Sequence, residues 1–304
     1  MTLTSSRQGV NATVNDIKQL GELLLPLLKK GQSIYSILQS HREIKLSEKT
    51  IYNYIENGVF QDVGVSISTI DLKRVVRRKM SKQKRNTYKP RKDNRYLTGR
   101  KYSDFLIYME KNPNAKVVEM DTVYNDVSNG PFLQTFKFRE YDLLICIYQT
   151  VKDSLHMLDG ILLLEKILGK EMFEKEVEVI LTDRGSEFIL AEEAEIREDG
   201  MRRTRMFYCD SMASWQKGSL ENVHLLVREI CPKGCDLHAL GLTSQEKANL
   251  ISTNINSYPK EKLHGRSSIQ LLHFYNEEMA KRLYDFGITE IAADEVILKP
   301  YLLK

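Results

Sequence analysis

The stretch from Val177 to Phe188, which reads VEVILTDRGSEF, constrains the fold of this chain more than any other. A short run rich in Val, Ile and Leu leads to Thr182-Asp183, and Arg184-Gly185 then breaks the pattern. Such a run, closed by a glycine turn, indicates a buried strand with Asp183 at its carboxyl end. In open α/β sheets, ligands bind at that end of the strands. We therefore expect an α/β domain with a functional acid at Asp183.

Two other stretches place carboxylates where they could join Asp183. Residues 116–123 (KVVEMDTV) are a second apolar strand with Asp121 near its end, and residues 215–234 form a helix that carries Glu221. Magnesium and manganese prefer oxygen ligands, and phosphoryl-transfer sites bind them with a few carboxylates and substrate phosphate. The leading hypothesis is a site for two Mg²⁺ or Mn²⁺ ions, held by Asp121, Asp183 and Glu221.

Each of these acids also has an ordinary structural interpretation. An aspartate at a strand end is more often a turn former or a helix cap. Glu119, which shares the face of Asp121 at strand spacing, is the favoured alternative ligand, ahead of Asp126. Glu187 could assist the metal, but solvation of a turn is the preferred interpretation. His224 is more typical of packing or phosphate contact than of metal ligation.

The helix that carries Glu221 has a clear apolar face. Its apolar stripe turns Glu221 and Arg228 onto another face of the helix; the stripe consists of Leu220, Val223, Val227 and Ile230. Lys217 and Arg228 could then contact DNA phosphate beside the metal ions. Arg184, which follows Asp183, is a third candidate for a phosphate contact.

The order of the expected elements indicates the fold. Three strands come first, then a helix, a strand, a second helical piece, a strand and the Glu221 helix; the strands are residues 116–123, 132–138, 141–149, 177–183 and 203–209. The first three predict an antiparallel meander, and the helix from Ser154 to Gly169 can make a right-handed crossover to the fourth strand. This order is that of a ribonuclease-H-like core with a mixed five-stranded sheet. After Gly234 we expect a helical tail, in which Thr243-x-x-Glu246 forms a capping box.

The N-terminal residues predict a helical DNA-binding module. A short helix in residues 32–40 is followed by a second one that Ser47 caps, which is the layout of a helix-turn-helix. On the second helix Lys49, Tyr52 and Asn53 face outward and suit base edges and phosphates. The alternative, on pattern alone, is an ordinary helical hairpin.

Positive charge is concentrated in one arm between the two predicted domains. Residues 73–101 contain fourteen Lys or Arg and one acid, Asp93, which leaves 31 basic and 40 acidic residues elsewhere, a net charge of −9. Such a basic arm is the electrostatic footprint of a phosphate-backbone partner, so we favour nucleic-acid contact over a solvated linker. The arm residues chosen as DNA contacts are Arg77, Arg78, Lys84 and Arg85.

Length and composition limit the remaining possibilities. A chain of 304 residues is long enough for several domains. We expect a helix-turn-helix module at 1–60, a basic linker at 61–110, a catalytic core at 111–276 and a tail at 277–304. The four cysteines lack paired metal-ligand spacing, which argues against a zinc module or a disulfide framework. With neither a signal peptide nor an apolar run long enough to span a bilayer, we expect a soluble cytoplasmic protein.

Three stretches of the chain resemble the active-site motifs of one known family. VVEMDTV, ILTDRGSEF and FYCDSMASWQKGSLENVHLLVREICPKG are similar to those of insertion-sequence transposases of the IS-thirty type, which belong to the retroviral-integrase-like DDE enzymes. The most specific parts are the G-x-x-E-N run in residues 218–222 and the Pro-Lys-Gly of residues 232–234. INSYPKEKLHG, in residues 255–265, also resembles the tail of the family.

The resemblance implies that the acidic triad of the family falls on Asp121, Asp183 and Glu221. It also implies a ribonuclease-H-like core, two divalent ions, and oligomers acting on the terminal inverted repeats of the element. The sequence departs from the family at Ser211, at Arg184 and at Ser267-Ser268, and none of these changes removes a metal ligand. Many members carry a further helix-turn-helix ahead of this one, so a truncated or decayed copy is one expectation.

The predicted reaction is DNA cutting and joining. A metal-activated water would hydrolyse a phosphodiester at the element end, and the exposed 3′-hydroxyl would attack target DNA (double-stranded, like the element ends). Two alternatives are a metal-dependent nuclease of the same fold and a decayed, non-catalytic DNA-binding copy. We expect the protein in the bacterial cytoplasm, where it would associate with the nucleoid when it is bound to DNA.

Overall fold

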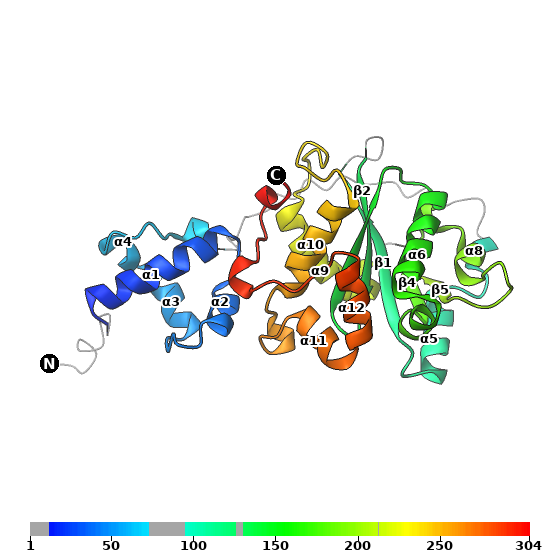
Figure 1. Cartoon of the computed structure of the whole chain (residues 1–304), viewed down its shortest axis with the longest axis horizontal. Coiled ribbons are helices and arrows are strands. Elements are labelled where there is room, and N and C mark those ends of the chain that lie inside the picture. The colour runs from blue at the N-terminus through cyan, green and yellow to red at the C-terminus, as the bar shows by residue number, and fades with distance from the viewer. Residues whose placement is uncertain (1–11, 73–94, 126–129, 212) are drawn as a thin grey trace. The chain divides into compact units, whose positions relative to one another are not determined.

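The computed structural model describes residues 12–72, 95–125, 130–211 and 213–304. The chain forms two compact units (Figure 1). The first consists of Met1–Lys82 together with Ala293–Ile297, and the second of Gln83–Ala292 together with Leu298–Lys304.

The described part of the first unit is helical. Its helices are α1 (Val14–Lys29), α2 (Ile34–Ser40), α3 (Glu48–Glu56) and the single turn α4 (Val59–Asp62), followed by the 3₁₀ turn η2 (Thr69–Asp71). The predicted start of α3 is confirmed, because the Ser47 hydroxyl accepts a hydrogen bond from the amide of Thr50. Apolar faces of α1, α2 and α3 meet in one core, in which Leu24, Ile37 and Ile51 have no exposed surface.

A short segment from near the C-terminus belongs to this first unit. Residues 293–297, which include the 3₁₀ turn η7 (Ala293–Glu295), contact the end of α1 and the ends of α2. The Lys30 ammonium donates to the carbonyl of Asp294 at 2.6 Å, and the Asp294 carboxylate lies 3.0 Å from His41 Nε2. The Gln32 amide donates to the carbonyls of Ala293 and Val296. Residues 293–297 are thus held within the first unit largely by side-chain hydrogen bonds to their backbone carbonyls.

The second unit is built on a mixed five-stranded sheet. Its strands are β1 (Val117–Val123), β2 (Phe132–Phe138), β3 (Leu143–Gln149), β4 (Val179–Thr182) and β5 (Arg205–Tyr208). The order across the sheet is β3-β2-β1-β4-β5. The pairs β1–β2 and β2–β3 are antiparallel, and β1–β4 and β4–β5 are parallel. An antiparallel meander extended by two parallel strands is the ribonuclease-H-like topology, so the predicted fold class is confirmed.

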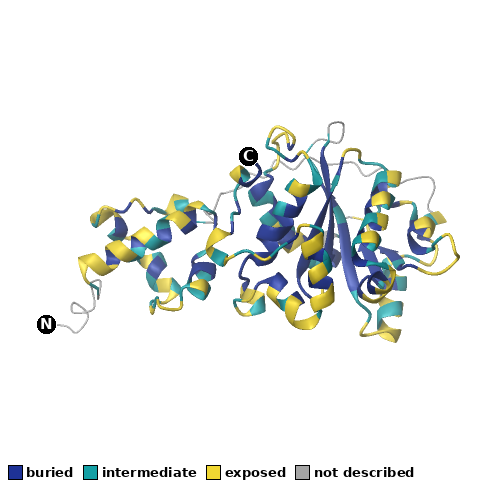
Figure 2. Cartoon of the chain, viewed as in Figure 1, coloured by how far each residue is buried: buried dark blue, intermediate teal, exposed yellow. Residues whose placement is uncertain are grey.

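Helices cover both faces of this sheet (Figure 1). The helices and turns of the unit are η3 (Arg95–Leu97), α5 (Tyr102–Lys111), α6 (Ser154–Leu168), α7 (Lys170–Glu176), η4 (Ser186–Phe188), α8 (Ala191–Glu195), η5 (Ser214–Lys217), α9 (Gly218–Ile230), α10 (Gln245–Ser257), η6 (Glu261–Leu263), α11 (Ser268–Tyr275), α12 (Glu277–Asp285) and η8 (Pro300–Leu303). Strand and inner helix surfaces are buried, as the dark blue ribbon of Figure 2 shows. No helix in the described ranges is long and apolar enough to cross a membrane.

Alternation along the strands separates the two faces. Val118, Met120 and Thr122 of β1 point toward α6, whereas Val117 packs with α5 on the opposite face. Side chains of a strand alternate between faces, so Glu119 and Asp121 share the side of Val117. The two acids of β1 therefore lie on the side of the sheet away from α6.

Helix α6 approaches the sheet closely at Gly160. The Gln134 amide of β2 donates to the carbonyl of Met157, and the Gln149 amide of β3 donates to that of His156. A β-carbon at Gly160 would overlap the Gln134 Oε1 and come within 2.8 Å of Gln149 Nε2. Glycine at this position lets two buried glutamines bond the first turn of the helix.

Helix α10 satisfies the outer edge of β3 with polar side chains. Asn256 accepts from the amide of Leu144 at 2.8 Å and donates to its carbonyl at 2.7 Å. Ser252 accepts from the amide of Cys146, and Gln245 accepts from that of Tyr148. The polar face of α10 is therefore buried rather than solvated.

The predicted start of α10 is wrong by one residue. Its N-cap is Ser244, not Thr243, and the helix begins at Gln245. The Thr243 hydroxyl donates to the carbonyl of Gly241 instead, and the Ser244 hydroxyl donates to Glu246. The expected capping box therefore does not form.

A buried charge cluster ties the residues after α10 to the β2–β3 turn. Asp142, in the left-handed region at φ 52°, is bonded to Lys137, Lys260 and Lys262, and its carbonyl accepts from the Ser268 hydroxyl. Burial by itself would raise the pKa of the Asp142 carboxyl, but the ammonium groups of Lys260 and Lys137 outweigh it and lower that pKa to about 2. Opposite charges at close range favour the ionised form.

Candidate active site

The carboxylates of Asp121 and Asp183 lie at the ends of neighbouring parallel strands. The β1–β4 ladder pairs residues 117–119 with residues 179–181, so each aspartate lies two positions beyond its last paired residue. Both acids project on the side of the sheet that α9 contacts. The structure therefore brings together the two aspartates that the sequence singled out.

A buried ammonium group lies between these two aspartates. The Lys217 Nζ is 2.9 Å from Asp121 Oδ2, 3.3 Å from the carbonyl of Met120 and 4.0 Å from Asp183 Oδ2. The residue is only 3% exposed. Burial by itself would lower the pKa of the Lys217 ammonium, but Asp121 and Asp183 outweigh it and raise that pKa. Lys217 is therefore a positively charged part of the aspartate site.

Asp183 is surrounded by acidic groups as well as by Lys217. Its pKa is raised, first by burial and then by the charges of Asp121 and Glu187, although Lys217 opposes the shift. Glu187 is 6% exposed and pairs with Lys152, so the interpretation of Glu187 as a solvated turn residue is wrong. A β-carbon at Gly185 would lie 2.6 Å from Glu187 Oε2 and 2.9 Å from Asp183 Oδ1. Any larger residue at position 185 would thus displace the carboxylates of Glu187 and Asp183.

Glu119 anchors the N-terminus of α9. Its side chain is fully buried, and its carboxylate accepts from the amide of Leu220 at 2.5 Å and from the Arg139 guanidinium at 2.6 Å. Arg139 also donates to the carbonyl of Gln216 at 3.4 Å. Both oxygens of Glu119 are bonded within the protein in this way, which favours an anchoring role over its alternative interpretation as a metal ligand. The other alternative, Asp126, lies outside the described residues.

Glu221 occupies the first turn of α9 but stands apart from the two aspartates. Its side chain is exposed and forms neither a hydrogen bond nor an ion pair with the described residues. Within those residues, no group of three or more His, Cys, Asp or Glu side chains is close enough to hold a metal ion. Asp121 and Asp183 do converge on one cation, the Lys217 ammonium, and their oxygens are the ligand type that Mg²⁺ prefers. These two residues fit a divalent ion.

His224 and Arg228 of α9 are bonded to β2 and to the residues that follow β1. His224 Nε2 lies 3.0 Å from the Thr135 hydroxyl, which also donates to the carbonyl of Asp121. Burial lowers the pKa of His224 to about 4, although Asp121 opposes the shift. Arg228 donates to the side chain of Asn125 at 2.7 Å and to the carbonyl of Tyr124 at 3.0 Å. The buried stripe of α9 (Leu220, Val223, Val227 and Ile230) is confirmed.

The other predicted DNA contacts are distributed over both units. Arg184 pairs with Asp210 at 2.8 Å and donates to the carbonyl of Cys209. In α3 Lys49 and Asn53 are exposed, whereas Tyr52 is half-buried against the helical core. The arm residues Arg77, Arg78, Lys84 and Arg85 lie outside the described residues.

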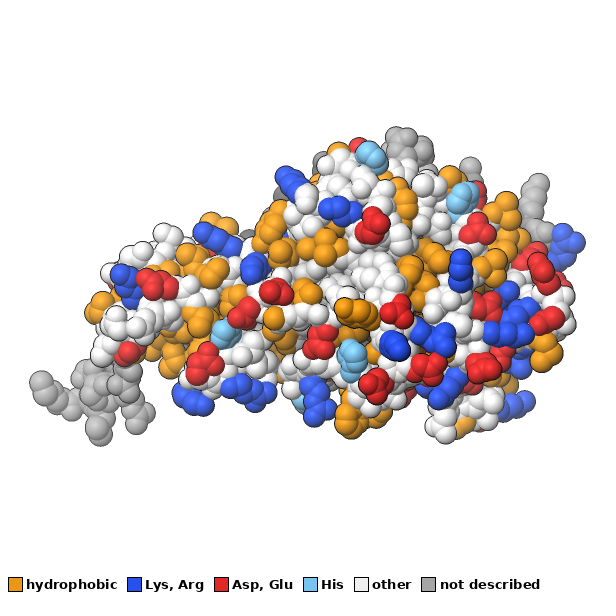
Figure 3. Space-filling view, viewed as in Figure 1, with side chains coloured by type: hydrophobic (Ala, Val, Ile, Leu, Met, Phe, Trp, Pro, Cys, Tyr) orange, Lys and Arg blue, Asp and Glu red, His pale blue; other side chains and the backbone are white. Residues whose placement is uncertain are grey.

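Charges on the visible face of the α/β unit are mixed in sign. Figure 3 shows Lys and Arg side chains interspersed with Asp and Glu there. Most of the fourteen basic residues of the predicted arm lie outside the described ranges. Among the described residues on this face, positive charge is not concentrated as it is in the sequence of that arm.

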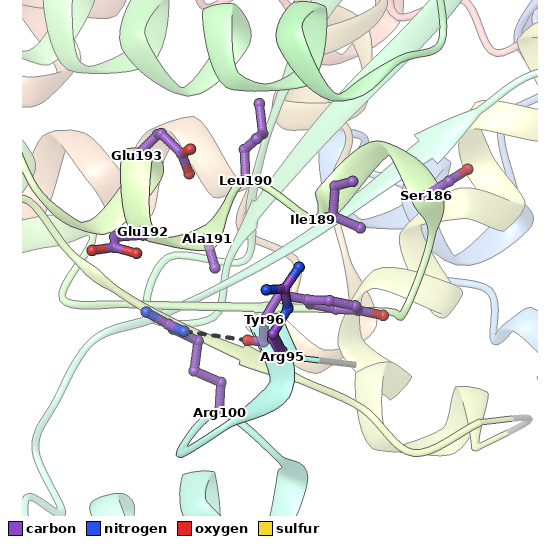
Figure 4. Close-up of a pocket in the computed structure, with 9 residues that line it drawn as sticks. All are labelled: Arg95, Tyr96, Arg100, Ser186, Ile189, Leu190, Ala191, Glu192 and Glu193. Carbon is purple, nitrogen blue, oxygen red and sulfur yellow. Dashed lines mark hydrogen bonds between the residues drawn. The ribbon is translucent and has the colours of Figure 1, made fainter. Parts of the chain in front are cut away.

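A pocket lies beside the loop that follows Asp183 (Figure 4), and neither Asp121 nor Asp183 is among the residues that line it. Its volume is about 530 Å³, and it is lined by Arg95, Tyr96, Arg100, Ser186, Ile189, Leu190, Ala191, Glu192 and Glu193. Arg100 donates to the carbonyl of Tyr96 at 3.3 Å and pairs with Glu195 at 2.9 Å. The lining of the pocket therefore contains both basic and acidic side chains.

The sheet order and the paired strand-end aspartates define a ribonuclease-H-like α/β domain with an acidic site. No family model matches the sequence. The chain is 37% identical over 68 residues to the transposase for insertion sequence element IS1086 of Cupriavidus metallidurans. That match covers 22% of this chain and 19% of the relative, so the chain spans about a fifth of the length of the curated protein that it matches.

Solved structures of two viral integrases also align with the chain. The HTLV-2 integrase catalytic core domain in complex with magnesium (trimeric form) aligns over 51% of this chain and 94% of its own, with a TM-score of 0.33 and 15% identity. The simian T-cell lymphotropic virus intasome in complex with PP2A regulatory subunit B56 gamma aligns over 53% and 56%, with a TM-score of 0.34 and 15% identity.

Proposed function

We propose that this chain is a DDE transposase of the IS-thirty type, which cuts and joins DNA at the ends of an insertion sequence. The observation that carries the proposal is the convergence of Asp121 and Asp183 on one cation at the strand ends of a ribonuclease-H-like sheet. Similarity to the IS1086 transposase supports the same class of reaction.

Asp121, Asp183 and Glu221 would hold the metal ions, Mg²⁺ or Mn²⁺. Two such ions, when bound, supply an activated attacking oxygen and stabilise the leaving oxygen of an in-line displacement. Asp121 and Asp183 offer oxygens from two adjacent strands, which are rigid supports for a site. Glu119 holds the first turn of α9 against β1 through the amide of Leu220, so it positions the turn that carries Glu221.

DNA would be bound by both units. Lys49, Tyr52 and Asn53 of α3 would contact the terminal inverted repeats, and the basic arm would contact the phosphate backbone. Within the α/β unit Arg184, Lys217 and Arg228 would act on phosphates near the cut. We assign residues 1–60 to the helix-turn-helix module, 61–110 to the linker, 111–276 to the catalytic core and 277–304 to the tail. The active form would be a homo-oligomer on double-stranded DNA.

The test is DNA cleavage and strand transfer by the Asp183→Asn variant. The substrate is a duplex that carries the inverted repeat flanking the gene for this chain, with Mg²⁺ or Mn²⁺ present. We expect loss of cleavage with DNA affinity within about twofold of wild type, because the substitution removes a metal ligand and leaves the DNA-binding surfaces intact. Asp199→Asn, at an exposed pair with Lys170, is the matched control and should cleave normally.

Each product pattern decides between candidate functions. Cleavage followed by joining, lost in Asp183→Asn, supports the transposase. Cleavage without a joined product identifies a nuclease of the same fold, and binding without cleavage identifies a non-catalytic copy. Unchanged cleavage by Asp183→Asn would exclude the proposed site. Affinity should also fall steeply as salt rises, since the basic arm releases counterions from DNA.

A further inference from the structure

The Lys217 ammonium occupies the space that a cation shared by Asp121 and Asp183 would need. It contacts Asp121 Oδ2 at 2.9 Å and the carbonyl of Met120 at 3.3 Å, and lies 4.0 Å from Asp183 Oδ2. The side chain is 4% exposed, so little water reaches its charged end. A metal ion that binds both aspartates would need this same position. The metal ion and the ammonium therefore exclude each other.

Charge balance explains why an ammonium lies there. Two carboxylates at neighbouring strand ends repel each other, and their side chains, 26% exposed for Asp121 and 49% for Asp183, are only partly solvated. Lys217 neutralises one of the two charges, whereas a divalent ion would neutralise both. The lysine and the metal ion are therefore alternative counter-charges for the same pair of acids.

We infer that Lys217 is a built-in counter-cation that keeps Asp121 and Asp183 together before metal binds and is displaced when metal arrives. This inference rests on the proposed metal-dependent function. It assigns a second role to a residue that the sequence predicts only as a phosphate contact. The displaced ammonium would then be available to a DNA phosphate, which joins the two roles in one side chain.

The backbone around Lys217 permits such a displacement. Lys217 ends the 3₁₀ turn η5, and Gly218 begins α9. A β-carbon at Gly218 would meet nothing within 4 Å, so the first residue of α9 is not packed against other parts of the chain. The neighbouring Leu220 stays bonded to Glu119, so the side chain can move while the helix keeps its anchor.

The affinity for Mn²⁺ distinguishes a counter-cation role of Lys217 from a purely structural role. In the Lys217→Met variant the competing charge is gone, so we expect Mn²⁺ to bind at least about tenfold tighter by calorimetry. The melting temperature should fall without metal and recover most of the loss with Mn²⁺, because bound ligand stabilises the folded state. A structural lysine would lower both melting temperatures equally and leave affinity unchanged. Lys217→Gln provides a second variant if the methionine variant folds poorly.

Lys116→Met is the matched control. Its ammonium pairs with Glu176 at 2.7 Å and lies at the start of β1, at the opposite end of the strand from Asp121. The control should lose stability equally with and without Mn²⁺ and bind the ion like wild type. Tighter binding in this variant as well would show a general charge effect and overturn the inference.

Chemical labelling of the wild-type chain tests the displacement without a mutation. Acetic anhydride modifies accessible lysines, and mass spectrometry reports each site. We expect Lys217 to react slowly without metal and at least about tenfold faster with saturating Mn²⁺, while Lys116 stays unchanged. Equal labelling of Lys217 in both conditions contradicts the inference and leaves the proposed function standing. If neither wild type nor Lys217→Met binds Mn²⁺, the metal-dependent function fails as well.

Discussion

Removal of the Glu119 carboxylate should loosen the N-terminus of α9. In Glu119→Ala the buried amide of Leu220 loses an ionised acceptor at 2.5 Å, a type of hydrogen bond worth about 1.5–3 kcal/mol. The loss of negative charge at the helix start adds about 0.3–1 kcal/mol. The Arg139 side chain is 36% exposed and can be solvated, so its pairing contributes about 1 kcal/mol or less. We expect a total destabilisation of about 3 kcal/mol.

Urea denaturation followed by circular dichroism measures this loss. Glu119→Gln keeps an acceptor for Leu220 and loses the charge, so it should lose about half as much, roughly 1.5 kcal/mol. Glu278→Ala removes an exposed i,i+4 pair with Arg282 and should cost less than about 0.5 kcal/mol. Hydrogen exchange at the Leu220 amide should accelerate in Glu119→Ala. A destabilisation below about 1 kcal/mol, with exchange unchanged, would refute the assignment of Glu119 as an anchor.

Three further substitutions test the packing that supports the site. Asn256→Leu leaves both the amide and the carbonyl of Leu144 without partners and should cost about 2–4 kcal/mol in urea denaturation. Gly160→Ala should be destabilising by about 1–3 kcal/mol despite the better helix propensity of alanine, because its methyl group overlaps Gln134; a higher melting temperature would contradict this. The Asp142 carboxyl has a folded pKa of about 2, below its ordinary value of 3.8, so its contribution to stability is present above pH 3.8 and lost as pH falls toward 2. Asp142→Asn should lack that acid-dependent loss in melts from pH 5 to about 2, and an unchanged pH profile would count against it.

The sheet was predictable because its apolar runs are long and bounded by turns. Each predicted strand overlaps an observed one, and the central strand β1 begins within one residue of its expected start. The position of Asp121 and Asp183 on one face also follows from strand alternation. Local pattern was sufficient for these features because buried strands need continuous apolar residues.

The partners of polar side chains were not predictable from local pattern. Glu119 shares the face of Asp121, which makes it a possible ligand by pattern, but its partners are Arg139, which follows β2, and Leu220 of α9. The sequence predicts a phosphate contact for Lys217. In the structure its ammonium contacts Asp121, which is 96 residues away in the sequence. Such pairings depend on tertiary contacts, which leave no periodic pattern in a single sequence.

The burial of the polar face of α10 is a second feature that local pattern does not predict. Serine and asparagine on a helix usually indicate a solvated surface. Here Ser252 and Asn256 have no exposed surface, because they bond the backbone of an edge strand. Their spacing along the helix is compatible with alternate residues of β3, and this match is visible only in three dimensions.

The satisfied edge of β3 restricts how copies of this chain can assemble. The outward amides of Leu144 and Cys146 are already bonded to α10. At the opposite edge the amide of Met206 is bonded to Glu195 and that of Tyr208 to the carbonyl of Arg100. A neighbouring molecule therefore finds no row of free backbone amides at these positions on which to add a strand. Copies of this chain, if they assemble as proposed, would have to recognise one another through helical or loop surfaces rather than by extending the five-stranded sheet at these positions.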